Sequence, residues 1–178
     1  PRFRNPHYED YVIEVTPDGK VVREINVLAA IMNSDYRGLL PLIPGTGPDW
    51  HPWLSAGDDP THLNSVDFLD HDIAPNFPFS AGDILVSLRN LDAICVIDKK
   101  SGLVKWASRG LSVQQHSARF THDGHIILID NAGAVPTFDK TRVIEIDPLT
   151  HKIVWSYDHD LDTGIQGTVR VLPNDNVL

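Results

Sequence analysis

The sequence predicts an all-β protein made of consecutive β-propeller blades, and three observations lead to this fold class. First, three segments share one pattern, in which a β-branched run meets an Asp-bearing turn and a second short run follows: residues 11–25, 93–106 and 142–155. Second, a complementary pattern sets turn residues before an apolar strand, at residues 82–86, 124–128 and 174–178. Third, the two hairpins that close on Trp recur at about 50 residues, a period typical of four-stranded blades. Strands are therefore expected in groups of four.

In chain order, the first hairpin turns at residues 16–19, and a short helical turn is expected around residues 26–32. Residues 33–80 then form an irregular insertion rich in Pro, Gly, Asp, Trp and His. Loops of this length are usually functional or disordered, and the aromatic residues of this one favour order. We expect the insertion to lie over one face of the ring and to contain a short strand near residues 65–69.

The last residues, 169–178, read as a strand that the sequence does not complete. About three to four blades are therefore expected, whereas closed propellers typically have about four to eight. We predict that residues 1–178 are part of a single propeller domain and a fragment of a longer chain. The alternative that the residues leave open is a β-sandwich with irregular loops.

Composition excludes several classes of protein. The net charge is −9 and no cluster of Lys and Arg is present, which argues against a nucleic-acid partner. Cys95 is the single cysteine, so an internal disulfide and a zinc site built on several thiolates are excluded, and a buried structural thiol is expected. No run of residues approaches the roughly 20 apolar residues of a membrane span, and residues 1–6 lack the apolar core of a signal peptide. Composition therefore does not indicate the compartment.

Polar residues interrupt the predicted strands at three places, where they would converge on the central channel of a ring. His62 and Asn64 are separated by one residue and so point to the same side of an extended strand. Arg89 ends the strand 84–86, where its guanidinium could bind a tetrahedral oxyanion with two parallel hydrogen bonds. His116 follows Gln115 just before the hairpin 118–128. These residues supply two imidazoles, one amide and one permanent cation.

In this order, the motifs resemble the bacterial arylsulfate sulfotransferase family over residues 62–157. The His-x-Asn-Ser segment of that family is similar to residues 62–65, its Ser-x-Arg strand end to residues 87–89, and its Gln-His pair to residues 115–116. Further along, an Asp-Asn-Gly stretch resembles residues 130–133, and an Arg-bearing strand with a late Trp-x-Tyr resembles residues 142–146 and 155–157.

The resemblance implies a six-bladed propeller that transfers a sulfuryl group from an aryl sulfate ester to a phenol without a nucleotide sulfate donor. It implies that His116 is the nucleophile and forms a sulfohistidine, since neutral imidazole is largely free base at neutral pH. Arg89 and Asn64 would stabilise charge on the sulfuryl oxygens, and His62 would contact sulfate or act as acid and base. Arg142 would add positive potential. The resemblance further implies no cofactor and no metal, phenols and aryl sulfates as small-molecule partners, and export to the periplasm; it leaves homo-oligomer formation open.

One feature of the family has no counterpart in these residues. The family has a further active-site histidine in a preceding blade, commonly in a His-His-Asp context, and no such motif precedes Tyr11. That histidine either lies upstream or has been lost.

Two other functions remain open at this point. The first is a non-catalytic propeller that binds a partner or a small anion. The second is a quinone-dependent dehydrogenase propeller, which is disfavoured because such sites use a calcium cluster and adjacent cysteines. Asp67, Asp70, Asp72 and His71 resemble a metal cluster but lack a recognised ligand spacing. Trp106 and Trp155 are expected to pack within blades.

Overall fold

The computed structural model describes residues 7–40, 59–132, 140–158, 161, 163 and 166–178. It confirms the all-β class and consists of ten strands with a short helix and two 3-10 turns. The strands are β1 (Tyr11–Val15), β2 (Val21–Asn26), β3 (Leu63–Phe68), β4 (Ile84–Leu88), β5 (Ala93–Ile97), β6 (Val104–Arg109), β7 (His116–Phe120), β8 (Ile126–Asp130), β9 (Arg142–Asp147) and β10 (Lys152–Tyr157). The helix is α1 (Val27–Met32), and the 3-10 turns are Arg37–Leu39 and Arg89–Leu91.

Strands group as the sequence predicts, into one hairpin and two four-stranded antiparallel sheets. β1 pairs with β2, the first sheet has the order β3-β4-β5-β6, and the second has the order β7-β8-β9-β10. Each sheet is a simple antiparallel meander in which neighbours in sequence are neighbours in space. The predicted strand near residues 65–69 is β3. Residues 41–58 of the predicted insertion lie outside the described residues.

Local sequence explains the first hairpin and the helix. Gly19 has φ of 83° in the turn between β1 and β2, a conformation in which glycine carries no steric cost. Asn26 caps α1, because its side-chain oxygen accepts a hydrogen bond of 2.8 Å from the backbone N–H of Ala29. The expected helical turn around residues 26–32 is therefore confirmed.

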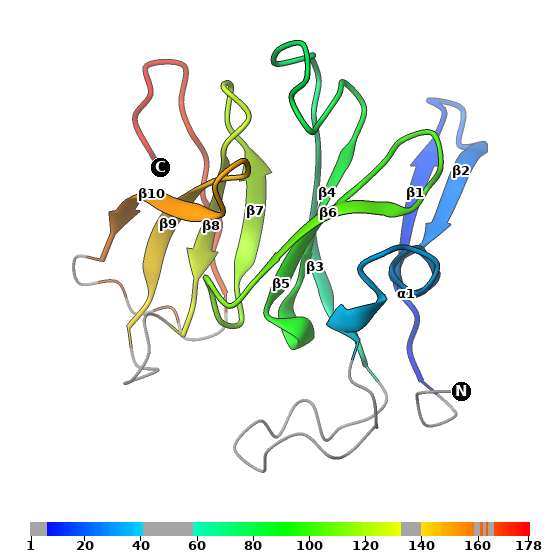
Figure 1. The fold of residues 1–178 in the computed structure, drawn as a ribbon, viewed down its shortest axis with the longest axis horizontal. Coiled ribbons are helices and arrows are strands. Elements are labelled where there is room, and N and C mark those ends of the chain that lie inside the picture. The colour runs from blue at the N-terminus through cyan, green and yellow to red at the C-terminus, as the bar shows by residue number, and fades with distance from the viewer. Residues whose placement is uncertain (1–6, 41–58, 133–139, 159–160, 162, 164–165) are drawn as a thin grey trace.

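The first hairpin with α1, the first sheet and the second sheet lie side by side along the molecule (Figure 1). Three apolar clusters join these parts and the C-terminal segment. The first packs α1 against the first sheet, the second lies between the two sheets, and the third joins the second sheet to the segment that holds Val169. Cys95 is fully buried in the first cluster, and burial raises the pKa of its thiol to about 12. This agrees with an unreactive structural cysteine.

The C-terminal residues form a narrow hairpin beside β7. Arg170 and Leu178 exchange two backbone hydrogen bonds of 2.9 Å, and Val171 forms a β-bridge with Val177. The backbone N–H of Val169 donates to the hydroxyl of Ser117 at 3.0 Å. The hydroxyl of Ser65 accepts a similar hydrogen bond from Ala118 on the neighbouring strand β7. The same kind of contact thus ties β3 to β7 and β7 to the C-terminal segment.

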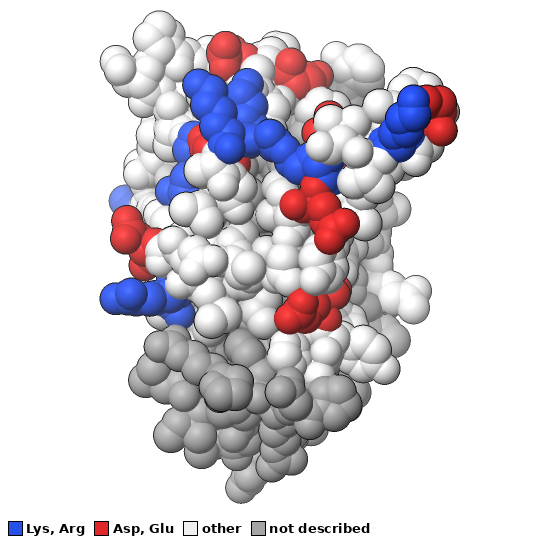
Figure 2. All heavy atoms as spheres, turned by 90° about the vertical axis from the view of Figure 1, so that its right-hand side faces the viewer, with Lys and Arg blue, Asp and Glu red and all other residues white. Residues whose placement is uncertain are grey.

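The face shown in Figure 2 carries both basic and acidic side chains. Basic side chains gather in the upper part of this view, with acidic side chains beside and below them. In the turn between β1 and β2, for example, Lys20 pairs with Asp18 at 3.0 Å. The described part of this face is therefore not a continuous basic surface of the kind that binds nucleic acids.

Candidate active site

The residues that the sequence singles out lie at one end of the two sheets, around the segment Gln114–Gln115 that leads into β7. Gln115 is fully buried, and its side-chain amide donates to the carbonyl of Ala93 at 2.8 Å and to the hydroxyl of Ser87 at 3.2 Å. Gln114 has a positive φ of 53°, and its backbone N–H donates to Asp92 at 2.8 Å. These contacts hold the segment against the end of the first sheet.

Asn64 contacts this segment from β3. The register between β3 and β4 shifts between Leu63 and Ser65, so Asn64 sits at a β-bulge, a feature that re-aims a side chain. Its side-chain N–H donates to the carbonyl of Gln115 at 2.8 Å. Its side-chain oxygen is buried and has no hydrogen-bond partner among the described residues. Asn64 therefore holds the residue just before His116 and keeps one acceptor unused.

Arg89 contacts the same segment from the turn after β4. It is 7% exposed, and its guanidinium donates to the side-chain oxygen of Gln114 at 3.0 Å and to that of Asn90 at 3.2 Å. Burial lowers the pKa of Arg89, while the nearby carboxylates of Asp92 and Asp59 act in the opposite direction. A buried cation attracts an anion strongly, because water screens it poorly.

His116 is the first residue of β7 and also lies beside a bulge, because the register between β7 and β8 shifts between His116 and Arg119. Its Nδ1 is 3.0 Å from the carbonyl oxygen of Gln114 and 2.8 Å from Oδ1 of Asn131. Both partners are acceptors, so Nδ1 must carry the proton. In the neutral imidazole, Nε2 then holds the lone pair.

His62 borders this group through its backbone. Its carbonyl accepts a hydrogen bond of 3.2 Å from the N–H of Arg89, and its φ of 48° is in the left-handed region. Its Nδ1 lies 2.5 Å from Oδ2 of Asp59, and its side chain is 45% exposed. A carboxylate on Nδ1 leaves Nε2 of this imidazole for proton exchange.

Arg142 contacts the site indirectly. Its Nε donates to Asp130 at 2.8 Å, and its guanidinium also donates to the carbonyl of Leu111 at 3.1 Å. Asp130 is fully buried and accepts a further hydrogen bond of 2.8 Å from the N–H of Val113. Burial raises the pKa of Asp130, and the hydrogen bonds from Val113 and Arg142 oppose this. The pair thus anchors residues 111–113, which lead to Gln114.

Sequence reasoning assigned no role to Gln114 and Asn131, although Asn131 lies in the quoted stretch 130–133. Asn131 is 3% exposed and follows β8 directly. A second polar residue directly after Asp130, at the end of an otherwise apolar strand, is a signal that could have identified it. Its partner, however, is 15 residues away in sequence, and no local pattern relates the two.

The residues noted as a metal cluster have other contacts. Asp67 accepts from the N–H of Phe120, Asp72 accepts from the N–H of Ala81, and Asp70 bonds His71. Within the described ranges, one group of three side chains could hold a metal ion, because each offers one ligand atom and these atoms lie close together: Asp123, His125 and Glu145. They lie at the start of β8, at the opposite end of that strand from Asn131. His125 and Glu145 satisfy one another by a hydrogen bond of 2.7 Å.

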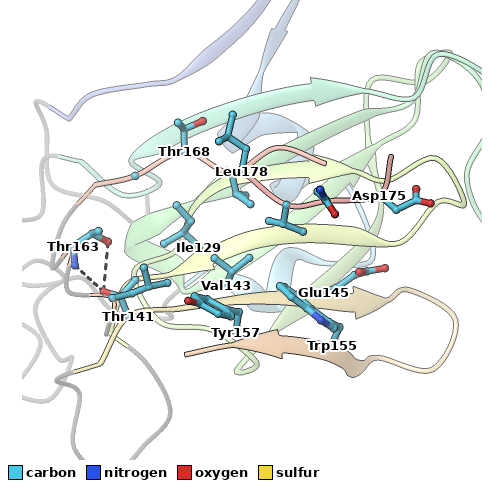
Figure 3. A pocket seen from close by; sticks show the side chains of 15 residues that line it. Ile129, Thr141, Val143, Glu145, Trp155, Tyr157, Thr163, Thr168, Asp175 and Leu178 are labelled. Atoms are coloured by element: carbon cyan, nitrogen blue, oxygen red, sulfur yellow. Dashed lines mark hydrogen bonds between the residues drawn. The ribbon is translucent and has the colours of Figure 1, made fainter. Parts of the chain in front are cut away.

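A cavity of about 810 Å³ opens between the second sheet and the C-terminal hairpin (Figure 3). Its walls include Val143, Trp155 and Tyr157 from β9 and β10, with Thr163 and Thr168 towards one end. His116 is not among its lining residues. One lining residue, Thr163, nevertheless accepts hydrogen bonds from Asn131, the residue that contacts His116.

Comparison with protein families places the chain in a class of sulfuryl-transferring enzymes. Residues 5–178 match the family described as arylsulfotransferase (ASST). The chain therefore belongs to the arylsulfotransferase family, and the resemblance seen in the motifs is confirmed at the level of the family. Membership supports an arylsulfotransferase-type activity. A search of curated proteins found no match. Among the described residues, no helix is long and apolar enough to cross a membrane.

Proposed function

We propose that the protein transfers a sulfuryl group from an aryl sulfate ester to a phenolic acceptor through a sulfohistidine on His116. The observation that carries the proposal is the hydrogen bonding of His116, whose Nδ1 faces two acceptors, the carbonyl of Gln114 and Oδ1 of Asn131. This leaves Nε2 as the nucleophilic nitrogen. The reaction needs no nucleotide donor, cofactor or metal.

In the first half-reaction, the Nε2 lone pair attacks sulfur, an N–S bond forms, and the S–O bond to the aryl group breaks. The aryl oxide leaves with the bonding electrons and takes up a proton. In the second half-reaction, the oxygen of the acceptor phenol attacks sulfur, loses its proton, and returns the N–S electron pair to Nε2. By analogy with phosphoryl transfer, most of the catalysis is positioning and stabilisation of charge on the sulfuryl oxygens.

Arg89 supplies the charge that stabilises these oxygens. Its guanidinium is buried and is linked through Gln114 to the backbone that carries His116. A positive group fixed in a poorly solvated place needs little reorganisation when the transition state forms, so it stabilises developing charge efficiently.

Asn64 and His62 assist on the side of the first sheet. One N–H of the Asn64 amide donates to the carbonyl of Gln115, and the unused side-chain oxygen can accept a hydrogen bond from a hydroxyl but not from a sulfuryl oxygen. We therefore assign Asn64 to the phenolic acceptor. His62, oriented by Asp59, exchanges the proton with the phenol oxygen. Arg142 supports the site through Asp130 and does not bind substrate.

We further propose that residues 1–178 belong to one β-propeller domain with an irregular insertion at about residues 33–80. Two four-stranded antiparallel meanders with adjoining first strands, β3 and β7, are typical of neighbouring blades. Sites of propellers lie where first strands meet, which is the position of Asn64 and His116. Export to the periplasm is proposed from family membership.

The test is transfer from a chromogenic aryl sulfate to phenol by the purified protein. We expect His116→Ala to lose at least about 10³-fold in kcat/KM, because no other group replaces the nucleophile. His122→Ala removes an exposed histidine outside the site and should keep wild-type activity. Transfer by His116→Ala at the wild-type rate would exclude the mechanism. Binding of aryl sulfates without any transfer by the wild type would favour a non-catalytic module.

A further inference from the structure

Asn131 has an amide whose orientation is determined by its surroundings. Its side-chain N–H group faces three acceptors, the carbonyl and hydroxyl oxygens of Thr163 at 3.3 and 3.1 Å and the carbonyl of Gln166 at 2.7 Å. An amide turned by 180° would direct its oxygen at these oxygens. The side-chain oxygen of Asn131 therefore points to Nδ1 of His116.

Both acceptors on Nδ1 are uncharged. Two charged groups contact Gln114 instead of the ring: Arg89 binds the side chain of Gln114, and Asp92 accepts from its backbone N–H. Asp130, next to Asn131, is paired with Arg142. Within the described ranges, no carboxylate forms a hydrogen bond or an ion pair with the ring of His116, and its Nδ1 proton is held by neutral amide oxygens.

We propose that Asn131 is a positioning residue that keeps the sulfohistidine reactive, an inference that rests on the proposed function. When Nε2 attacks sulfur and Nδ1 keeps its proton, the sulfated ring becomes cationic. A cationic ring is a good leaving group, because it becomes neutral when the N–S bond breaks and the electron pair returns to Nε2. A neutral amide holds the Nδ1 proton without removing it and without stabilising the positive charge strongly.

A carboxylate in the same place would change this balance. It would either take the Nδ1 proton, which makes the sulfated ring neutral and a poorer leaving group, or form an ion pair with the cationic ring. Both outcomes stabilise the intermediate. The first half-reaction, in which positive charge develops on the ring, would not suffer. Asn131→Asp is therefore expected to separate the two half-reactions, an effect that a purely structural role would not produce.

The experiment follows release of a chromogenic phenol by stopped flow and the mass of the protein under the same conditions. Asn131→Asp should show a burst approaching one equivalent per site, and steady-state turnover at least about tenfold below wild type, since one unit of pKa corresponds to tenfold. It should also retain one SO₃ group on His116 in the mass spectrum. The acid limb of the burst rate should move to higher pH, because a carboxylate favours imidazolium.

Three further variants complete the test. Asn131→Leu removes the acceptor and should slow the burst itself, while urea unfolding reports any loss of stability. Asn76→Asp makes the same chemical change in an exposed loop and should behave as wild type. Wild-type burst and turnover in both Asn131 variants, together with an inactive His116→Ala, would overturn this inference and leave the proposed function standing. An active His116→Ala would overturn both.

Discussion

The two four-stranded sheets have the same frame but carry different chemistry at the end where the site lies. After its second strand, the first sheet places Arg89 and the second sheet places Asn131. In both sheets, the following residue forms a backbone hydrogen bond with the segment that precedes the first strand. The N–H of Asn90 donates to the carbonyl of Thr61 at 3.3 Å, and the N–H of Ala132 donates to the carbonyl of Val113 at 3.2 Å. The same backbone arrangement thus presents a cation in one sheet and a neutral amide in the other.

The difference extends to the strands and to the layers that cover them. The first strand of the first sheet carries Asn64, whereas the first strand of the second carries His116. Trp106 on β6 is 5% exposed because the second sheet covers it, whereas Trp155 on β10 is 39% exposed and lines the cavity of Figure 3. Shared geometry therefore gives each sheet its shape, and the neighbouring layer decides what each side chain contacts.

The largest effect on stability is expected from a substitution in the cross-strand pair at the end of the second strand and the start of the third strand. This pair is Leu88 and Ala93 in the first sheet, but the ion pair Asp130 and Arg142 in the second. Arg142→Met should cost about 3–5 kcal/mol in the free energy of unfolding at neutral pH, because a buried carboxylate loses its partner. Urea unfolding measures this.

The pH dependence of that loss has a definite sign. A group whose folded-state pKa is raised stabilises the protein below its unfolded pKa and loses this contribution as pH rises through the folded value. Without Arg142, the raised pKa of Asp130 should rise further. The deficit of Arg142→Met should therefore shrink towards pH 4 and grow towards pH 8. A deficit that does not change with pH would contradict the assigned role of Asp130.

The two tryptophans provide a matched pair of variants. Trp106 donates from its indole N–H to the carbonyl of Pro148 at 3.0 Å and packs against Phe79 and His151. Trp106→Ala should cost about 3–5 kcal/mol, as expected for a buried aromatic residue. Trp155→Ala should cost about 1 kcal/mol in comparison, because the side chain is partly solvated. Equal losses in urea unfolding would show that the second sheet does not protect Trp106 in solution.

The sulfuryl-transfer activity of Arg89→Lys can be compared with that of Asn131→Asp, which is expected to affect the second half-reaction. Arg89→Lys keeps the charge but loses the planar fork that binds Gln114 and Asn90, so kcat/KM should fall about 10²-fold. A pre-steady-state assay should assign this loss to both half-reactions, since both pass through a charged sulfuryl group. A loss confined to the second half-reaction would mean that Arg89 acts on the acceptor.

The smallest difference is expected between two glycines that precede the second strand of each sheet. Gly82 and Gly124 both have positive φ, 92° and 85°, so alanine costs about 1–2 kcal/mol at either position. An added Cβ at Gly82 meets the flexible chain of Lys99, whereas at Gly124 it meets Phe77 and Ile73. Gly124→Ala should thus cost about 1 kcal/mol more than Gly82→Ala. Thermal unfolding of the two variants resolves the difference.

Much of the fold could be predicted, because its signals are local. Alternating and apolar runs, with Asp and Gly in the turns between them, indicate strands within a few residues of β5, β8 and β9. The pairing of strands into hairpins follows from the same signals, since a short turn permits only an antiparallel neighbour. The buried environment of Cys95 and of Trp106 also follows from the sequence.

The candidate side chains could likewise be named from the sequence, because Asn64, Arg89 and His116 interrupt the predicted strands and stand in the order of the family motifs. Their arrangement was decided only in the tertiary structure. That Arg142 is bound to Asp130, that Asn64 keeps an unused acceptor, and that the amide of Asn131 fixes the proton on His116 all depend on contacts between different strands and loops. Such contacts form when sheets pack against each other, and bulges set by that packing aim the side chains. The candidate residues could therefore be identified from local sequence, whereas their hydrogen-bond partners could not.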